Sequence, residues 1–485
     1  MLTIPPIVST SFGIFGRMLW FAFLKVLSIH AAIFFAVLPF FIPESTRARH
    51  TYICGASGSG KSELIKALVY TYLRRPWFGL QANAVTRRPM SIIVLDPAGD
   101  MPKQIAHWPE VASNPDQVAY IDPTLSDKHV IRINPFDQLP LNADERTIDR
   151  WVEYLAIAFA QLSSRGGFAD ASGNMRVLLT PILHVLLRRP GSTIEDLQAF
   201  MVKERNEPLI ALGRELKNPA HANFFTDKFE SKHFDRAREA IYSRMQDILN
   251  ATPLRRVLMG KSTIRLADVV NRGSVVLFRF PKGGTGLESA PTMGTLITSL
   301  LQAIAFDREP LPEHERTPTH LFIDEAQNYI NHTLQEILDE LRKFGLHVTL
   351  ATQHTDQLPE DIRESVLTNC ATIMTGIAAA KTVRRLSNEF NLKGFKLRRL
   401  KPGQFYLKRK GPYLAHRFRV PFKLVKFNHR VSDADWKAFV KFQLATHYEP
   451  INGRPAQLEC PKPLLLEEGA RSLLIPAAAR KKQFV

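Results

Sequence analysis

The fold of this chain is decided by an eight-residue stretch, Gly55-Ala56-Ser57-Gly58-Ser59-Gly60-Lys61-Ser62. It matches the pattern G-x-x-x-x-G-K-[ST] of a phosphate-binding loop. Residues 50–54 before it predict a short buried strand, and apolar residues at helical spacing follow from Leu64 to Tyr72. A strand, a glycine-rich loop and a helix in this order are the context that the pattern requires. A phosphate-binding loop is therefore favoured over the alternative, a plain glycine turn.

The residue types of this loop predict the binding of ATP and Mg²⁺. Glycines allow backbone N–H groups to wrap around phosphate oxygens, and the N-terminus of the following helix adds the positive end of its dipole. We expect the whole stretch to bind the nucleotide, with Lys61 paired to the β- and γ-phosphates. The hydroxyl of Ser62 is expected to bind Mg²⁺.

A second motif, His320-Leu-Phe-Ile-Asp324-Glu325, is an apolar strand that ends in two acids. Such a strand is common by itself, but downstream of a phosphate-binding loop it predicts the other half of the site. We expect Asp324 to hold Mg²⁺ and Glu325 to polarise the attacking water. A glutamate directly after the strand aspartate favours hydrolysis over simple nucleotide binding or kinase transfer.

Two further residues are candidates for catalysis. Gln353 ends the apolar run at 350–352, and its amide would sense the γ-phosphate or the water if it lies beside the acids; the alternative is an ordinary loop or N-cap glutamine. Arg342 lies near the end of a predicted helix at 334–344. It either complements the helix dipole or reaches the nucleotide of a neighbouring subunit as an arginine finger.

The order of the predicted elements indicates an α/β fold with an inserted helical block. Continuous apolar runs at 91–95, 118–121 and 274–280 predict parallel strands that are buried on both faces. Strand patterns are absent from 141 to 265, where apolar residues follow helical spacing. The predicted divisions are an N-terminal anchor at 1–46, the nucleotide-binding domain at 47–140 and 266–430, an all-α insertion at 141–265, and a partly disordered C-terminal extension at 431–485.

The N-terminus contains a candidate membrane helix. Residues 26–42 form a run of seventeen without formal charge, which is the lower limit for crossing a bilayer core of about 30 Å. Snorkelling of Lys25 would extend the span back to Met18. The alternatives are an interfacial or buried helix, or a signal peptide, which is disfavoured because no small-residue cleavage site follows. Arg47 and Arg49 favour a cytoplasmic location for the rest of the chain.

Positive charge is concentrated near the C-terminal end. The chain carries a net charge of +18. Between 381 and 430 there are sixteen Lys or Arg residues and only one acidic residue, Glu389. Interleaved aromatic residues, from Phe395 to Phe427, make this stretch typical of a nucleic-acid groove; an anionic membrane surface and plain solubility are the alternatives. The alternation at 403–408 and 415–421 equally indicates edge strands with a solvated basic face. The candidate DNA-binding residues are Lys396, Arg398, Arg399, Lys408, Arg409 and Lys410. The three cysteines are too far apart in sequence for a paired metal site or a dense disulfide framework.

The order of these motifs resembles the HerA/FtsK branch of P-loop motors, and within it the TraG/TraD-like coupling proteins of conjugation and type IV secretion. The resemblance rests on GASGSGKSE, LDPAGD, INPF, FIDEAQ and ATQ and covers about 47–407. It implies a RecA-like P-loop NTPase domain with an inserted all-α domain, an N-terminal membrane helix and a homohexameric ring. Ala98 departs from the lysine that this family usually has there, and the anchor is short for the usual two-span arrangement.

The resemblance also implies a function. The expected protein is a membrane-tethered hexameric ATPase that couples ATP hydrolysis to DNA translocation in conjugative transfer. It would lie in the bacterial cytoplasmic membrane, with its bulk in the cytoplasm, and its partners would be DNA, a relaxase or relaxosome and type IV secretion channel components. The alternatives are a HerA-like DNA-processing motor that is not tied to secretion, and a secretion-machine ATPase that acts on protein. Salt-sensitive DNA binding would separate the last from the other two.

Overall fold

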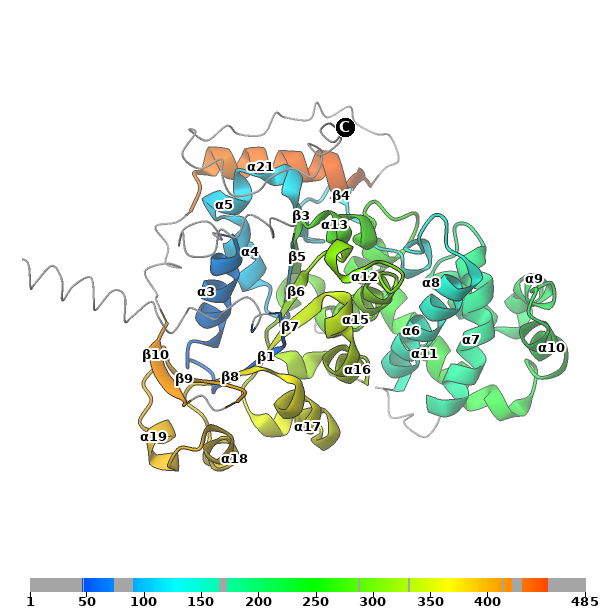
Figure 1. Cartoon of the computed structure of the whole chain (residues 1–485). Coiled ribbons are helices and arrows are strands. Elements are labelled where there is room, and N and C mark those ends of the chain that lie inside the picture. Colours follow the sequence, from blue (N-terminus) through cyan, green and yellow to red (C-terminus); the bar gives the residue numbers. More distant parts are fainter. Residues whose placement is uncertain are drawn as a thin grey trace, which may run out of the picture.

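A computed structural model describes residues 46, 48–73, 90–164, 172–286, 288–329, 332–411, 414–420 and 430–451 (Figure 1). The apolar stretch at 18–42 and the chain from 452 onwards lie outside the described residues. Within the described part, no helix combines the length and the apolar character needed to cross a membrane. The predicted membrane helix therefore stays a prediction.

The described residues are organised around a nine-stranded sheet with the order β10-β9-β8-β1-β7-β6-β2-β5-β3. From β8 to β3 all neighbouring strands are parallel, whereas β9 is antiparallel to both β8 and β10. The strands are β1 (Thr51–Cys54), β2 (Ser91–Asp96), β3 (Val118–Ile121), β5 (Val275–Arg279), β6 (Thr319–Ile323), β7 (Leu346–Thr352), β8 (Thr372–Thr375), β9 (Gln404–Arg409) and β10 (His416–Arg419). The α/β fold with a largely parallel sheet, predicted from the continuous apolar runs, is confirmed.

Both faces of the sheet are covered, which explains why its strands are continuously apolar. Successive side chains of a strand point to opposite faces, so Tyr52 and Cys54 join one core cluster and Ile53 joins the other. One face packs against α3 (Lys61–Leu73), α4 (Asp100–Ala106) and α5 (Pro109–Ala112). The other packs against α13 (Leu266–Arg272), α15 (Ser289–Phe306), α16 (His332–Glu340), α17 (Glu360–Asn369) and α18 (Ala380–Phe390) (Figure 1).

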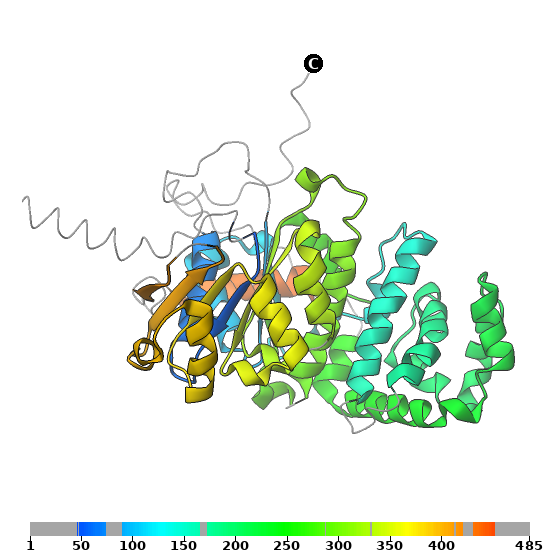
Figure 2. The ribbon, with the colours of Figure 1, turned by 60° about the horizontal axis from the view of Figure 1, so that its bottom comes forward.

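A helical block separates the first three sheet strands from the rest of the sheet in sequence. It contains α6 (Glu145–Ser164), α7 (Ser172–Arg188), α8 (Ile194–Phe200), α9 (Lys203–Arg214), α10 (Pro219–Asp227), α11 (Asp235–Asn250) and α12 (Thr252–Leu258). The indole Nε1 of Trp151 on α6 donates to Asp307 Oδ2, 2.9 Å away, just after α15. One continuous apolar core joins the block to the sheet, and the helices stand to one side of it (Figure 2).

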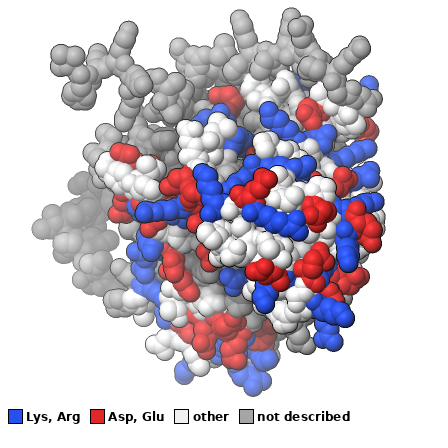
Figure 3. Space-filling model, turned by 90° about the vertical axis from the view of Figure 1, so that its right-hand side faces the viewer, with Lys and Arg blue, Asp and Glu red and all other residues white. Residues whose placement is uncertain are grey.

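The outer face of the helical block carries both signs of charge. In Figure 3, Lys and Arg side chains alternate with Asp and Glu side chains across this face. Because opposite charges are interspersed there, the face presents no single-sign field of the kind that attracts a polyanion. The excess positive charge of the chain is concentrated instead in the basic stretch from 381 to 430.

The edge strand β3 is covered by the C-terminal helix α21 (Asp433–His447). The amide of Gln443 donates to Val118 O at 3.0 Å and accepts from Tyr120 N at 2.9 Å. Covering a sheet edge in this way protects it from pairing with another chain. The remaining helices and strands are α14 (Lys282–Thr285), α19 (Gly394–Arg398), β4 (His129–Val130), β11 (Glu449–Pro450) and the 3-10 helices η3 (Pro115–Gln117), η4 (Pro135–Asp137), η6 (Lys232–Phe234), η7 (Glu313–Glu315), η8 (Ala326–Asn328), η9 (Leu341–Phe344) and η10 (Thr355–Gln357).

Candidate nucleotide site

The phosphate-binding loop connects β1 to α3 at the carboxyl edge of the sheet. Gly58 and Gly60 have φ values of 74° and 98°, in the left-handed region that glycine adopts without strain. A Cβ at Gly60 would lie only 3.3 Å from the Cα of Gly403, so the backbone of the basic segment approaches the loop closely. Gly403 N donates to Ser59 O at 2.8 Å. The loop is therefore clamped in shape by its own glycines and by the chain before β9.

The loop exposes groups that suit phosphate. The first backbone N–H groups of a helix have no acceptor within the helix, and those of α3 begin at Lys61. The hydroxyl of Ser59 is buried and has no hydrogen-bond partner among the described residues. Unpaired buried polar groups are uncommon in folded proteins and call for a partner. These features fit an anionic ligand at the start of α3.

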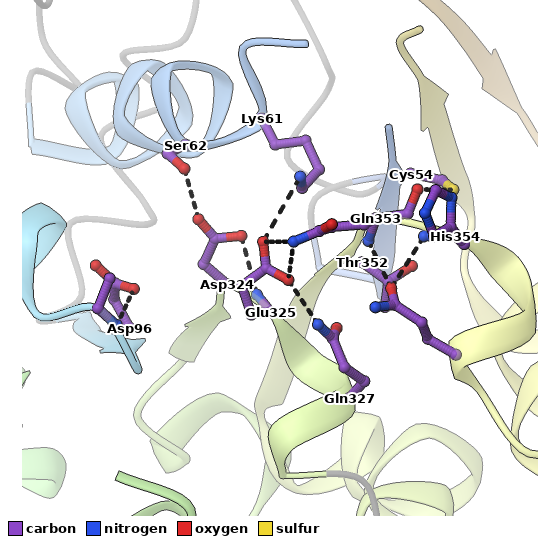
Figure 4. A network of polar contacts seen from close by, with 12 residues as sticks. Cys54, Lys61, Ser62, Asp96, Asp324, Glu325, Gln327, Thr352, Gln353 and His354 are labelled. Atoms are coloured by element: carbon purple, nitrogen blue, oxygen red, sulfur yellow. Dashed lines mark hydrogen bonds and ion pairs between the residues drawn. The ribbon is translucent and has the colours of Figure 1, made fainter. Parts of the chain in front are cut away.

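The two acids predicted at the end of β6 lie beside the loop. The Oγ of Ser62 donates to Asp324 Oδ2 at 2.6 Å, which brings the two predicted Mg²⁺ ligands together (Figure 4). Burial raises the pKa of Asp324 to about 6, with Asp96 adding to the rise, while the hydrogen bond from Ser62 opposes it. A buried carboxylate of this kind is stabilised by a cation, and oxygen donors are what Mg²⁺ prefers.

Glu325 is the centre of a hydrogen-bond network. Its carboxylate accepts from Gln353 Nε2 at 3.0 Å on both oxygens and from Gln327 Nε2 at 2.6 Å (Figure 4). Its Oε1 lies 3.7 Å from Lys61 Nζ. Glu325 also has a φ of 47°, which is unusual for a residue with a side chain and is typical of functional sites under strain.

Strand order explains why these residues meet. β7 lies between β1 and β6, with Cys54 opposite Thr352 and Ile323 opposite Leu350. The residues that follow the three strands therefore reach the same edge together, which is the general location of ligand sites in parallel sheets. The structure places Gln353 against Glu325, as expected if its amide senses the γ-phosphate or the water.

Three supporting residues were not predicted. Gln327 donates to Glu325 and follows it by only two residues, so the FIDEAQ motif itself contained the signal. Gln357 accepts from Gln353 N at 2.9 Å, a contact that needs the turn after β7 to be known. Tyr329 is buried against Gly294, where a Cβ would lie 2.0 Å from its ring. No sequence pattern indicates the contact of Gln357 with Gln353 or that of Tyr329 with Gly294.

Arg342 lies apart from the other predicted site residues. It is exposed in η9, just before the start of β7. His50, which directly precedes β1, lies near Arg342. Burial lowers the pKa of His50 to about 3, and the charges of His347 and Arg342 add to this effect. Arg342 therefore sits at the amino edge of the sheet, opposite to the phosphate-binding loop of its own chain. A role at the nucleotide of another subunit stays a prediction.

The predicted DNA-binding residues divide into two groups. Lys396, Arg398 and Arg399 are exposed on and after α19, and the guanidinium of Arg399 lies 5.3 Å from the ring centre of the exposed Phe395. The second group lies on β9 and just after it, where Lys408 and Arg409 are half-buried and Lys410 is exposed, and Lys408 Nζ donates to the backbone carbonyl of Glu389. The members of this second group are Lys408, Arg409 and Lys410.

The interleaved aromatic residues are only in part a stacking platform. Phe405 and Phe418 are buried in the core cluster that also contains the apolar residues of α3, and their ring centres lie 6.0 Å apart. Their sequence positions reflect strand alternation in β9 and β10, which confirms the alternative of edge strands for these two segments. The expectation that these two rings are available for bases is therefore wrong, whereas Phe395 is 49% exposed. Tyr413, Phe422 and Phe427 lie outside the described residues.

Comparison with known proteins gives matches of two kinds. Residues 318–396 match the family described as the TraM recognition site of TraD and TraG, whereas no curated protein sequence matches the chain. The fold is similar to that of the bacterial conjugative coupling protein TrwBdeltaN70 in its unbound form, with a TM-score of 0.58 and 17% identity over 81% of this chain and 88% of that chain.

Two further structures of the plasmid coupling protein TrwB are also similar. The complex with the non-hydrolysable GTP analogue GDPNP has a TM-score of 0.57 and 16% identity, over 81% of this chain and 89% of that chain. The complex with ADP and Mg²⁺ has a TM-score of 0.57 and 16% identity, over 80% and 89%. At such identities the likeness shows the fold. The chain is therefore similar to TraD and TraG over 318–396, and its fold is similar to that of the coupling protein TrwB.

Proposed function

We propose that this chain is a membrane-tethered, homohexameric ATPase that couples ATP hydrolysis to DNA translocation in conjugative transfer. The observation that carries the proposal is the convergence of two motifs more than two hundred and fifty residues apart, since Ser62 and Asp324 are separated by 262 positions and bonded at 2.6 Å. The plasmid coupling protein TrwB, whose fold this chain shares, has been solved in complexes with ADP and Mg²⁺ and with the ATP analogue ADPNP.

The residues present fit a magnesium-bound nucleotide. Ser62 Oγ and Asp324 Oδ2 would be the oxygen ligands for Mg²⁺, and the buried Asp324 carboxylate would gain from a nearby cation. A bound Mg²⁺ would supply positive charge next to the phosphates of the nucleotide. Lys61, at the start of α3, supplies a second positive charge to the same phosphates.

Hydrolysis requires a group that orients and polarises water, and Glu325 is suited to it. Its carboxylate is held by Gln353 and Gln327, so it points in one direction before the substrate arrives. The Lys61 ammonium lies 3.7 Å from the same carboxylate, so phosphates that bind Lys61 would compete with Glu325 for it. Gln353 then lies where an amide can contact both the water and the γ-phosphate.

The DNA and membrane parts of the proposal have separate support. The exposed cations of α18 and α19 offer phosphate contacts, and the apolar stretch at 18–42 offers an anchor in the bacterial inner membrane. The match to the TraM recognition site of TraD and TraG favours a relaxosome partner, and a type IV secretion channel, over a HerA-like motor that acts alone.

The experiment is a steady-state ATPase assay on the full chain in detergent, without DNA and with single- or double-stranded DNA over a series of salt concentrations. The proposal predicts stimulation by DNA that fades as salt rises, because phosphate contacts release counterions. The variant Lys61→Ala should abolish activity with and without DNA. ATP hydrolysis that is indifferent to every DNA would instead favour a secretion ATPase that acts on protein.

A further inference from the structure

The turn that follows Gln353 connects the hydrolysis centre to a basic helix. Gln357 Oε1 accepts from both Gln353 N and His354 N, at 2.9 and 3.0 Å. The side chain of Gln353 meanwhile donates to both carboxylate oxygens of Glu325. Gln353 is therefore held at its backbone by the turn and at its amide by Glu325, so a movement of the turn changes how Gln353 meets Glu325.

Asp356 ties this turn to two helices. Its carboxylate lies 3.0 Å from Lys381 Nζ, pairs with Arg385 Nη1, and lies 3.7 Å from Arg363 Nη1. Lys381 and Arg385 belong to α18, and Arg363 belongs to α17. Three cations on one surface carboxylate form a cluster rather than a single surface ion pair, which contributes little on its own.

The turn and α18 are also in direct contact beneath these ion pairs. Thr355 N and Oγ1 both lie 3.4 Å from Thr382 Oγ1, and both threonines are buried. Side chains packed in this way move together rather than independently. A displacement of the first turn of α18 would therefore be passed to residues 354–357.

The cations that hold Asp356 belong to the basic surface. Lys381 is 77% exposed and Arg385 is 33% exposed, so both can be reached from solvent. The other exposed cations of α18, α19 and the loops beside them are Arg384, Lys393, Lys396, Arg398, Arg399 and Lys401. A DNA phosphate offers the same kind of acceptor as a carboxylate, so DNA on this surface competes with Asp356 for Lys381 and Arg385.

We propose that Asp356 is a positioning residue through which DNA on the α18–α19 surface controls the hydrolysis centre. When phosphates take over Lys381 and Arg385, Asp356 is released, the turn at 354–357 shifts, and Gln353 changes its contact with Glu325. Asp356 touches neither nucleotide nor water in this scheme. The inference rests on the proposed DNA-dependent ATPase function and adds the route of its regulation.

The test compares Asp356→Asn with the wild-type chain in the ATPase assay, with and without DNA. The substitution keeps the size of the side chain and removes its charge. We expect the ratio of DNA-stimulated to basal kcat to fall about fivefold or more, a typical coupling between sites, while the KM for ATP changes by no more than about twofold. DNA affinity should be unchanged or higher, because an anion is removed from the basic surface.

Two variants serve as controls. Asp361→Asn removes an exposed acid from the first turn of α17 and should leave the stimulation ratio unchanged. Asp356→Glu keeps the carboxylate and should restore part of the stimulation lost in Asp356→Asn.

The outcomes separate this inference from the function on which it rests. A wild-type chain that DNA does not stimulate overturns the proposed function and the inference with it. A stimulated wild-type chain and an equally stimulated Asp356→Asn overturn the inference alone. If both Asp356 variants lose basal activity together with stimulation, the residue serves folding only, and the inference is again overturned.

Discussion

Replacing Glu325 with Gln separates nucleotide binding from hydrolysis. The carboxylate accepts two hydrogen bonds from Gln353 and one from Gln327, and it lies 3.7 Å from Lys61 Nζ. The glutamine amide has nearly the same shape, but one of its ends becomes an N–H donor that faces another donor. We expect a loss of stability of about 1 kcal/mol, because Glu325 remains 24% exposed and water can reach the unpaired group.

The effect on catalysis should be much larger. A positioned general base contributes about 10²- to 10⁴-fold to a rate, which corresponds to a barrier increase of about 3–5 kcal/mol. ATP binding should persist or strengthen, because the phosphate-binding loop is unchanged and Lys61 loses a competing anion. Phosphate release at saturating ATP measures the first effect, and equilibrium binding of a fluorescent ATP analogue measures the second.

A matched control is Glu340→Gln, which changes a 56% exposed acid that pairs with Lys343 at 4.0 Å. This variant should hydrolyse ATP at close to the wild-type rate. Should Glu325→Gln keep a kcat within about threefold of wild type, far below the loss expected of a general base, the assignment of Glu325 as the water-polarising residue would be refuted.

Three further predictions concern other parts of the site. Arg342→Ala should be inactive alone but should recover activity in mixed rings with Glu325→Gln subunits, and an absence of rescue in subunit-mixing assays would contradict a role in trans. Gly294→Ala would place a Cβ 2.0 Å from the ring of buried Tyr329, so urea unfolding should show a loss of about 1–3 kcal/mol, and an unchanged midpoint would contradict this packing. Burial raises the pKa of Asp324 to about 6, so in metal-free urea unfolding its contribution to stability should be greatest below about pH 4 and be lost as pH rises to about 6; Asp324→Asn should remove this slope, and a slope that persists would contradict the origin given for it.

The residues at the strand ends were predictable because their chemistry is local in sequence. The glycines, Lys61 and Ser62 form one loop, and Asp324 and Glu325 end one apolar strand, so each half of the site is visible in a few consecutive letters. Because the carboxyl ends of parallel strands meet at one edge of a sheet, the two halves come together there. Gln353 followed from the same argument.

The order of strands and the contacts between distant loops could not be predicted in the same way. Nothing near Gly403 indicates that it packs on Gly60, because that contact depends on β9 pairing with β8 at the end of the sheet. The alternation around Phe405 and Phe418 was compatible with edge strands and with a nucleic-acid groove, and only their burial in the core cluster that contains α3 decides between the two. Side chains that act through the packing of separate elements leave no pattern in a single stretch.

The most direct measurement of the central claim is ATP-driven movement along DNA. A duplex that carries a third strand as a block can be incubated with the full chain, and release of the third strand can be followed over time. The account predicts release that requires hydrolysable ATP and Mg²⁺, that fades with salt, and that Glu325→Gln abolishes while DNA binding is retained. Vigorous ATP hydrolysis with bound DNA but no displacement would contradict coupling of hydrolysis to translocation.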